Sequence, residues 1–203
     1  MVHIGDPSFY EAIKARLNRC DAIIFEGVKS FRGRLLTLAY RIPAKRKSLG
    51  LVLQSVAIPR KELRPVLIHG DVGSAAFALS WAEIPWHQRI PLLVMAPLYG
   101  LALYLFATRD YLSGGHNVDS LPSRNRSAAE DAIPAFFEAI VHSRDEHLLE
   151  LIEEHLSAGG NMERTTAVLF GGGHGPGIVG VLMRKHGYRV VHSEWITAIA
   201  TAA

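Results

Sequence analysis

The sequence has little cysteine and little charge, and these two shortages exclude several classes of protein. Cys20 is the only cysteine among 203 residues, which excludes a disulfide framework and a cysteine-based zinc site and is compatible with a reducing compartment. Charged residues make up 20% and hydrophobic residues 49% of the chain, so it is neither disordered nor fibrous. The net charge of +3 is too small to indicate nucleic acid as a partner.

Several familiar signals are also missing. The first residues contain no basic stretch followed by an apolar one, so we expect no signal peptide and a cytoplasmic location. No linker or internal repeat divides the chain, and its length predicts one domain over residues 1–203. The sequence contains no Walker lysine, no H-E-x-x-H pair and no G-x-S-x-G elbow, so the chemistry must come from another arrangement.

Short apolar runs alternate with helical patterns along the chain. Residues 1–5 predict a strand, residues 7–19 a helix capped by Asp6, and residues 21–25 a second strand, which together are typical of a parallel βαβ unit. Further predicted strands cover 65–69, 165–170 and 188–192, and further predicted helices cover 128–158, with a break near Ser143, and 176–186. The pattern predicts a single α/β domain with a mostly parallel sheet and helices on both faces.

Two segments have compositions that suggest contacts beyond the core. Residues 90–107 are the most apolar stretch, which we interpret either as a buried core or homodimer-interface helix or as a membrane-contacting segment. Residues 41–64 carry seven Lys and Arg side chains against Glu62 alone. Such a stretch is either a solvated basic face or a binding site for an anionic ligand or lipid surface.

Polar side chains follow the predicted strands at the points where the strands end. These residues are His3, Glu26, His69, Asp71 and His174. Ligands bind beyond the carboxyl ends of parallel strands, and neighbouring strands lie ~4.8 Å apart, so we expect His3 and Glu26 to share a ligand. Two imidazoles and one or two carboxylates suit Zn²⁺ or Mn²⁺, which would acidify a bound water. The alternative is that these groups only meet polar loops.

The glycine-rich loop 171–177 combines backbone freedom with a titratable side chain, His174. A competing interpretation takes Gly175–Gly180 as a G-x-G-x-x-G dinucleotide site, with Glu194 as the ribose-binding acid, although no second nucleotide-binding half follows. Arg144, at the start of a helical pattern, is either a surface ion-pair partner or a fixed cation that orients Glu26 or stabilises an oxyanion.

These motifs resemble the TraB/GumN/Tiki family of the EreA/ChaN-like superfamily over nearly the whole chain. The family pattern is two G-x-x-H motifs with a glutamate and an arginine between them. Gly171–His174 matches the second motif, Glu26 the glutamate, Arg144 the arginine and His3 the first histidine. The glycine of the first motif would precede Met1, so we expect the first strand to be incomplete.

The resemblance implies an EreA/ChaN-like fold and a metal-dependent, peptidase-like hydrolase that uses Mn²⁺ or Co²⁺ on a peptide or small-molecule substrate. We expect His3, Glu26 and His174 to hold the cation, Asp71 to assist them, and Arg144 to hold Glu26 or stabilise the oxyanion. Glu26 is alternatively the general base, and Gln54 a further polar position of the family. Other branches are membrane-associated regulators, so the competing hypothesis is a non-enzymatic, membrane-associated binding protein.

Overall fold

A small parallel sheet forms the centre of the part of the chain that carries the site. The computed structural model describes residues 2–27, 30–114, 134–138, 143–158 and 164–201. Three strands lie in the order β4 (Val66–His69), β2 (Ala22–Phe25) and β5 (Thr166–Leu169). Both outer strands run parallel to β2, and Phe25 is level with His69 on one side and Leu169 on the other. All three strands therefore end at the same edge.

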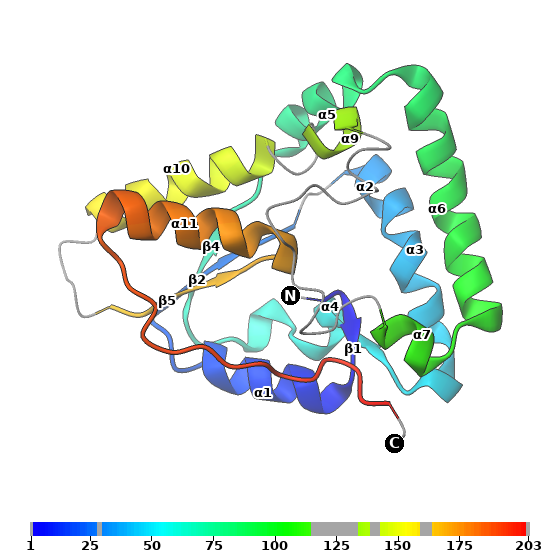
Figure 1. Cartoon of the computed structure of the whole chain (residues 1–203), viewed down its shortest axis with the longest axis horizontal. Coiled ribbons are helices and arrows are strands. Elements are labelled where there is room, and N and C mark those ends of the chain that lie inside the picture. Colours follow the sequence, from blue (N-terminus) through cyan, green and yellow to red (C-terminus); the bar gives the residue numbers. More distant parts are fainter. Residues whose placement is uncertain (1, 28–29, 115–133, 139–142, 159–163, 202–203) are drawn as a thin grey trace.

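Helices cover both faces of this sheet (Figure 1). On one face, Ile23 packs against Phe9, Tyr10 and Leu17 of α1 (Pro7–Leu17). On the other face, Ile24 packs against α10 (Ser143–Ala158) and α11 (Gly175–His186), through the buried side chains Leu148, Ile152 and Ile178. Successive residues of a strand point to opposite faces, so an uninterrupted apolar β2 serves both layers. The predicted α/β class with a parallel sheet flanked by helices is confirmed.

The predicted βαβ unit at the start of the chain is wrong. Strand β1 (Ile4–Gly5) pairs antiparallel with β3 (Val52–Leu53), in a two-stranded sheet of its own, and not with β2. Its partner comes from the apolar run 49–54, and β3 leads into the short helix α4 (Gln54–Ala57). Hydrophobic alternation shows that a segment is extended but does not show which segment it pairs with, so His3 was placed at the wrong sheet edge.

The predicted strand at 188–192 is also wrong. Residues 188–197 pair with no strand, and the C-terminal segment, residues 188–200, instead runs along α1 toward β1 (Figure 1). Val191 is 94% exposed, so the segment lacks the buried face that would hold it in a sheet. Its end is fixed by single contacts: Asp6 N–H donates to the Ala198 carbonyl at 2.8 Å, and Arg109 Nε donates to the Ala200 carbonyl at 2.8 Å.

A helical arm stands beside the sheet and forms one wall of the cavity described below. Its elements are α2 (Phe31–Leu36), α3 (Leu38–Arg41), α5 (Ser74–Glu83), α6 (Trp86–Phe106), α7 (Arg109–Ser113) and α9 (Pro134–Phe137), with the short 3₁₀ turns η1 (Pro43–Lys45), η2 (Lys47–Leu49) and η3 (Arg60–Glu62) nearby. Phe77, Trp81 and Ile84 form its buried centre. Helix α6 crosses α3 so closely that a Cβ at Gly100 would lie 2.4 Å from the Leu38 carbonyl oxygen.

Helix α6 contains the apolar stretch 90–107 except for its last residue, and the interpretation of that stretch as a buried core helix is wrong. Leu98 is 52% and Phe106 80% exposed, and most other large apolar side chains of α6 are exposed as well. Within the described residues, α6 is the one helix long and apolar enough to cross a membrane. The dimer-interface and membrane-contact interpretations both stay open.

Two further predictions concern the second half of the chain. The predicted break near Ser143 is where α10 begins. The rest of the helix predicted over 128–158 appears as α9, while 128–133 and 139–142 lie outside the described residues.

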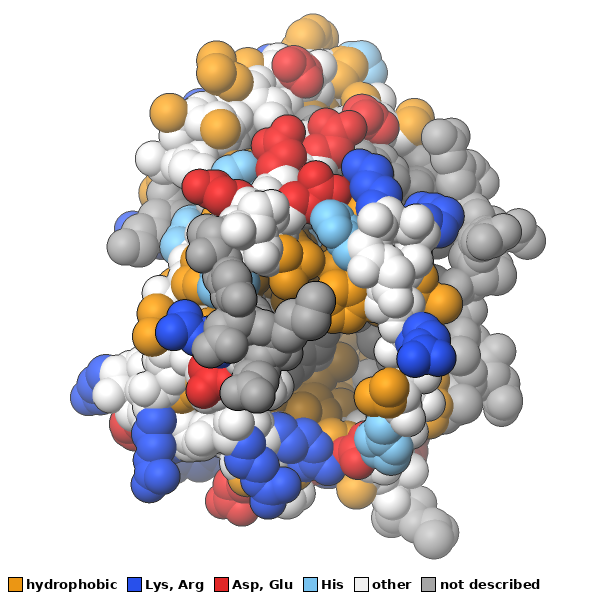
Figure 2. Space-filling view, turned by 90° about the vertical axis from the view of Figure 1, so that its left-hand side faces the viewer, with side chains coloured by type: hydrophobic (Ala, Val, Ile, Leu, Met, Phe, Trp, Pro, Cys, Tyr) orange, Lys and Arg blue, Asp and Glu red, His pale blue; other side chains and the backbone are white. Residues whose placement is uncertain are grey.

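The small net charge conceals a separation of charges on the surface. Figure 2 shows acidic side chains gathered in the upper part of one face and Lys and Arg side chains along its lower part. Helix α10 carries the acidic residues Asp145, Glu146, Glu150, Glu153 and Glu154, and α1 carries Lys14 and Arg16. Local surface charge, rather than the net value, therefore decides which ligands a given region attracts.

Candidate functional site

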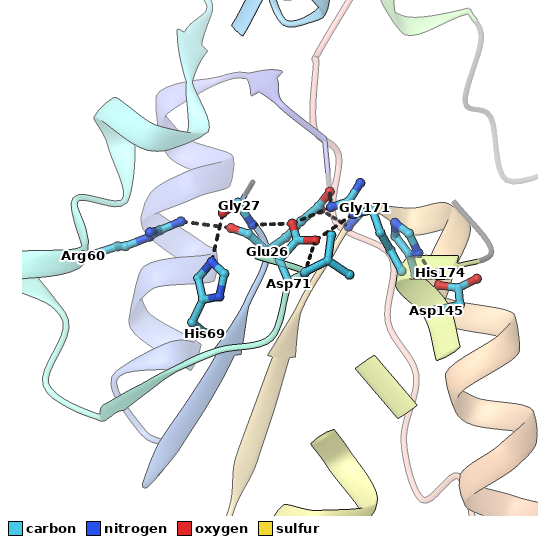
Figure 3. Close-up of polar contacts among 10 residues, drawn as sticks. Glu26, Gly27, Arg60, His69, Asp71, Asp145, Gly171 and His174 are labelled. Carbon is cyan, nitrogen blue, oxygen red and sulfur yellow. Dashed lines mark hydrogen bonds and ion pairs between the residues drawn. The ribbon is translucent and has the colours of Figure 1, made fainter. Parts of the chain in front are cut away.

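The carboxyl edge of the sheet brings four of the five predicted site residues together (Figure 3). Glu26 directly follows β2, Asp71 lies two residues beyond β4, and His174 ends the turn η6 (Gly172–His174) after β5. Helix α10 begins at Ser143, so its first turn supplies Arg144. The parallel register places these groups at one edge because the three strands end level with one another.

Arg144 bridges the two carboxylates. Its Nη2 donates to Glu26 Oε1 at 2.5 Å and to Asp71 Oδ2 at 2.7 Å, and its Nε donates to Asp71 Oδ1 at 2.8 Å. The side chain of Arg144 is 11% exposed, that of Glu26 19%, and that of Asp71 fully enclosed. A guanidinium suits this position, because its planar set of donors can bind two oxygens of one carboxylate and still reach another.

Backbone amides complete the hydrogen bonding of both acids. Asp71 Oδ2 accepts from Gly27 N–H at 2.8 Å, and Asp71 Oδ1 accepts from Val72 N–H at 2.9 Å. Glu26 Oε2 accepts from Gly171 N–H at 3.0 Å. The loops that leave all three strands are therefore tied to each other through two carboxylates.

These contacts keep Glu26 and Arg144, which together with Asp71 form what we call the clamp, ionised. Burial alone would raise the pKa of Glu26, but the charge and hydrogen bond of Arg144, with help from Gly171 N–H, hold that pKa below its usual value. Burial likewise opposes the charge of Arg144, yet the hydrogen bond to Asp71 and the nearby charge of Glu26 raise its pKa. Glu26 is thus a carboxylate and Arg144 a cation throughout the neutral range.

His174 lies on the other side of Gly171 from Glu26. Its Nδ1 contacts the carboxylate of Asp145, and the residue is only 7% exposed. A Cβ built on Gly171 would lie 3.8 Å from His174 Nε2 and 3.7 Å from Glu26 Oε2. The contact of Nδ1 with Asp145 leaves Nε2 as the ring nitrogen that lies near Gly171.

His3 is separate from this cluster, as its altered strand pairing requires. Its ring stacks on Tyr40 with centroids 4.5 Å apart, and it lines the same cavity as Glu26 and Arg144. Loss of solvent around the ring lowers the pKa of His3, against the opposing charge of Glu26 and a hydrogen bond with Gln54. His3 and Gln54 therefore belong to the cavity wall, and no contact joins His3 to His174 among the described residues.

The cavity has a volume of about 780 Å³, which is in the range of small-molecule sites. The clamp residues Glu26 and Arg144 form part of its wall, and side chains of the helical arm, including Phe77 and Phe136, form another part. Because it has an apolar surface and a few convergent polar groups, this cavity is the candidate ligand site.

Two important partners, Asp145 and Arg60, were not assigned to the site from the sequence. Asp145 contacts His174 Nδ1. Arg60 donates to the Glu26 carbonyl at 2.9 Å and lies 3.8 Å from the centre of the Phe25 ring. His69 donates from Nε2 to the Gly27 carbonyl at 2.9 Å, so it supports the loop after β2. Asp145 follows Arg144 directly in a helical pattern, a signal that both could face one site.

The predicted metal site does not fit this donor set. Asp71 accepts four hydrogen bonds, from Arg144 twice and from two backbone amides, which uses the lone-pair positions of a carboxylate. In the part of the chain that the structure describes, no three His, Cys, Asp or Glu side chains converge as metal ligands. Arg144 instead supplies the positive charge between the two carboxylates.

The dinucleotide interpretation also lacks its structural context. Helix α11 begins at Gly175, so Gly175, Gly177 and Gly180 lie in the helix and not in a turn that would receive a pyrophosphate. Glu194 lies in the C-terminal segment, where it follows no strand and pairs with Arg16 of α1.

No protein-family model, curated protein or solved structure matches this chain in the three comparisons with known proteins. The function must therefore be inferred from the geometry of the site itself.

Proposed function

We propose that this chain is a hydrolase of the TraB/GumN/Tiki type, on an EreA/ChaN-like scaffold, that cleaves a peptide or related acyl bond in a substrate bound in the cavity. The observation that carries the proposal is that His174 Nε2 and Glu26 Oε2 both lie within 4 Å of the position that a Cβ on Gly171 would take, while Asp145 contacts His174 Nδ1 and Glu26 lines the cavity. An imidazole oriented by a carboxylate is a common general base in acyl hydrolysis.

Glu26 and His174 divide the activation of water between them. Glu26, ionised and bordering the cavity, accepts a hydrogen bond from the water and orients it. Its low pKa makes it a weak base, so His174 Nε2 takes the proton as the water oxygen attacks the carbonyl carbon. The resulting imidazolium is stabilised by Asp145, and it returns the proton to the leaving group when the carbon–heteroatom bond breaks.

Arg144 supplies the oxyanion stabilisation in this scheme. Its Nε and Nη2 bind the two carboxylates, whereas its Nη1 donates to no described residue. Because Arg144 also lines the cavity, this nitrogen can donate to the oxygen that becomes negative in the tetrahedral intermediate. The two carboxylates hold the guanidinium in place before the substrate arrives, which lowers the cost of organising the site.

The test is hydrolysis of a panel of chromogenic esters, anilides and short peptides by the purified chain. We expect His174→Gln to lower kcat by about 10² to 10⁴ while KM changes little, because the base acts in the chemical step. His186→Gln, at the other end of α11 and in contact with Glu153, is the matched control and should leave kcat unchanged. Equal rates in the two variants, or no turnover of any panel member by the folded chain, would overturn the proposal.

Metal dependence is a separate question with a direct answer. The donor arrangement predicts that activity survives extensive treatment with EDTA and that elemental analysis finds less than one divalent ion per chain. Stoichiometric Mn²⁺, Co²⁺ or Zn²⁺ with loss of activity on chelation would show that the ligands rearrange around a metal ion and would refute the metal-free mechanism.

The second candidate is the non-enzymatic, membrane-associated binding protein, and the exposed surface of α6 favours it. The helix has 21 residues, and its exposed apolar side chains include Ile90, Val94 and Leu98. Near its C-terminal end, Arg46 donates to the carbonyls of Tyr104 and Ala107, which places a basic group beside the apolar surface. Apolar area with adjacent positive charge is typical of attachment to anionic lipid.

Vesicle flotation distinguishes this second function from a dimer interface. If α6 binds lipid, the chain should float with phosphatidylglycerol-containing vesicles, and Val94→Glu/Leu98→Glu should abolish flotation. Val191→Glu alters a more exposed valine outside α6 and is the control. If α6 pairs with a second copy instead, the wild-type chain should stay in the soluble fraction as a dimer. The variant Val94→Glu/Leu98→Glu should then be a monomer.

A further inference from the structure

The described wall of the cavity carries far more positive than negative charge. Five cationic side chains, Arg34, Arg41, Arg60, Lys61 and Arg144, line it, against one carboxylate, Glu26. Arg144 is shared by Glu26 and Asp71, so these three groups together carry a net charge of −1, which the other four cations of the wall exceed. This excess is local, because the whole chain has a net charge of only +3.

The cations form two groups that differ in availability. Arg144 is buried and Arg60 is occupied by the Glu26 carbonyl and the Phe25 ring. Arg34, Arg41 and Lys61 are exposed, and within the described ranges none of them forms an ion pair. Unpaired cations around a concave site attract anions and raise their local concentration.

Much of the cavity wall is apolar. Apolar side chains line it from both the sheet and the helical arm: Ile23, Phe25, Leu67, Leu169, Phe77 and Phe136. Such a surface binds an apolar body, whereas the cations bind an anionic group at its end. The volume of about 780 Å³ fits a small molecule or a few residues of peptide, and not a folded partner.

We propose that the cavity binds small anionic molecules that have an apolar body, and that the exposed cations of its wall, among them Arg41 and Lys61 (here called the rim), hold a carboxylate or phosphate group. Guanidinium groups bind carboxylate and phosphate oxygens in pairs, and an ammonium adds a compact charge. That such a molecule is the substrate rests on the proposed hydrolase function. The binding itself does not, and it can be measured without turnover.

The experiment is isothermal titration calorimetry of the purified chain with matched probes: 4-phenylbutyrate, 4-phenylbutyl phosphate, neutral 4-phenylbutanol and inorganic phosphate. We expect both anionic aryl probes to bind at least about tenfold more tightly than the alcohol, because hydrogen bonds to an ionised group are stronger than those between neutral groups. Added salt should weaken the anionic probes and leave the alcohol unaffected. Preference between the carboxylate and the phosphate identifies which anionic group the rim selects.

A rim variant and a charge-matched control make the test specific. Arg41→Gln/Lys61→Gln should remove the preference for the anions, whereas Arg32→Gln/Arg189→Gln, which changes two cations outside the cavity wall, should retain it. Circular dichroism confirms that both variants fold. Equal binding of alcohol and carboxylate, unchanged anion binding by the rim variant, or no detectable binding would overturn the proposal.

The two proposals fail separately. If the anionic probes bind at the rim but no panel substrate is hydrolysed, the hydrolase proposal fails and the ligand site stands. If hydrolysis depends on His174 but the probes neither bind nor inhibit, the anionic substrate class is refuted and the hydrolase proposal stands.

Discussion

Replacing Arg144 with methionine tests whether one guanidinium holds the carboxyl edge of the sheet. Methionine keeps much of the aliphatic length of arginine but removes the donors that reach Glu26 and Asp71 at 2.5 to 2.8 Å. The substitution leaves one carboxylate fully enclosed and another 19% exposed, with no cation between them.

The expected loss follows from that burial. Removing one partner of a buried ion pair typically costs about 3 to 5 kcal/mol, because the remaining charge stays desolvated. Glu26 retains some contact with water, so we expect about 3 kcal/mol for Arg144→Met, near the lower end of that range. A domain with a typical free energy of unfolding of about 5 to 15 kcal/mol should still fold.

Urea unfolding followed by tryptophan fluorescence and far-UV circular dichroism at neutral pH measures this loss. Arg16→Met is the control, because it breaks an exposed ion pair with Glu194, which should cost less than about 1 kcal/mol. Adding Glu26→Gln to Arg144→Met should recover part of the stability, since the amide removes one unpaired charge and can donate to Asp71. A loss no larger than that of Arg16→Met, or no coupling between the two site substitutions, would refute the clamp.

Three further results are expected. Gly70→Ala should destabilise the fold by about 1 to 3 kcal/mol in urea unfolding, because a Cβ there lies 2.4 Å from Ile24 Cγ2. The control is Gly177→Ala in α11, where a Cβ would meet nothing within 4 Å, so this variant should be neutral or stabilising. Equal changes in stability in Gly70→Ala and Gly177→Ala would contradict the packing argument. The pKa of Glu26 is lowered in the folded state, so its contribution to the free energy of unfolding is complete above its unfolded pKa of about 4.3 and is lost as the pH falls through the folded value. Glu26→Gln should therefore reduce the dependence of the free energy of unfolding on pH in the acid range. The same pH dependence in the wild type and the variant would oppose this. Arg109→Ala should raise hydrogen exchange at the end of the C-terminal segment well above that of α10, and unchanged protection would show that other contacts fix the segment.

The sequence predicted those parts of the fold that depend only on the residue pattern within a single segment. The uniform apolar run of β2 and the positions of Glu26, Asp71 and His174 after strands follow from local patterns, and the parallel register then brings these residues together. Arg144 was proposed to orient Glu26 both as a cation at the start of a helical pattern and through the family resemblance, but no local pattern decides between that role and a surface ion pair.

Partner choice explains the failures. Both β1 and the C-terminal segment are extended, as their apolar residues indicate, but extended backbone can pair in either direction or with no strand at all. The metal hypothesis stays a prediction for a related reason: residue types suggested ligands, while the hydrogen bonds that occupy the lone pairs of Asp71 depend on the folded loops.

In the proposed mechanism, Arg144 has a structural role as well as a catalytic one. The same side chain that would stabilise the oxyanion during the reaction also joins α10 to the loops that follow β2 and β4. Substitutions that tune the reactivity of this arginine will therefore alter the folding equilibrium as well, and new specificity on this scaffold should arise at the rim of the cavity before it arises at the clamp.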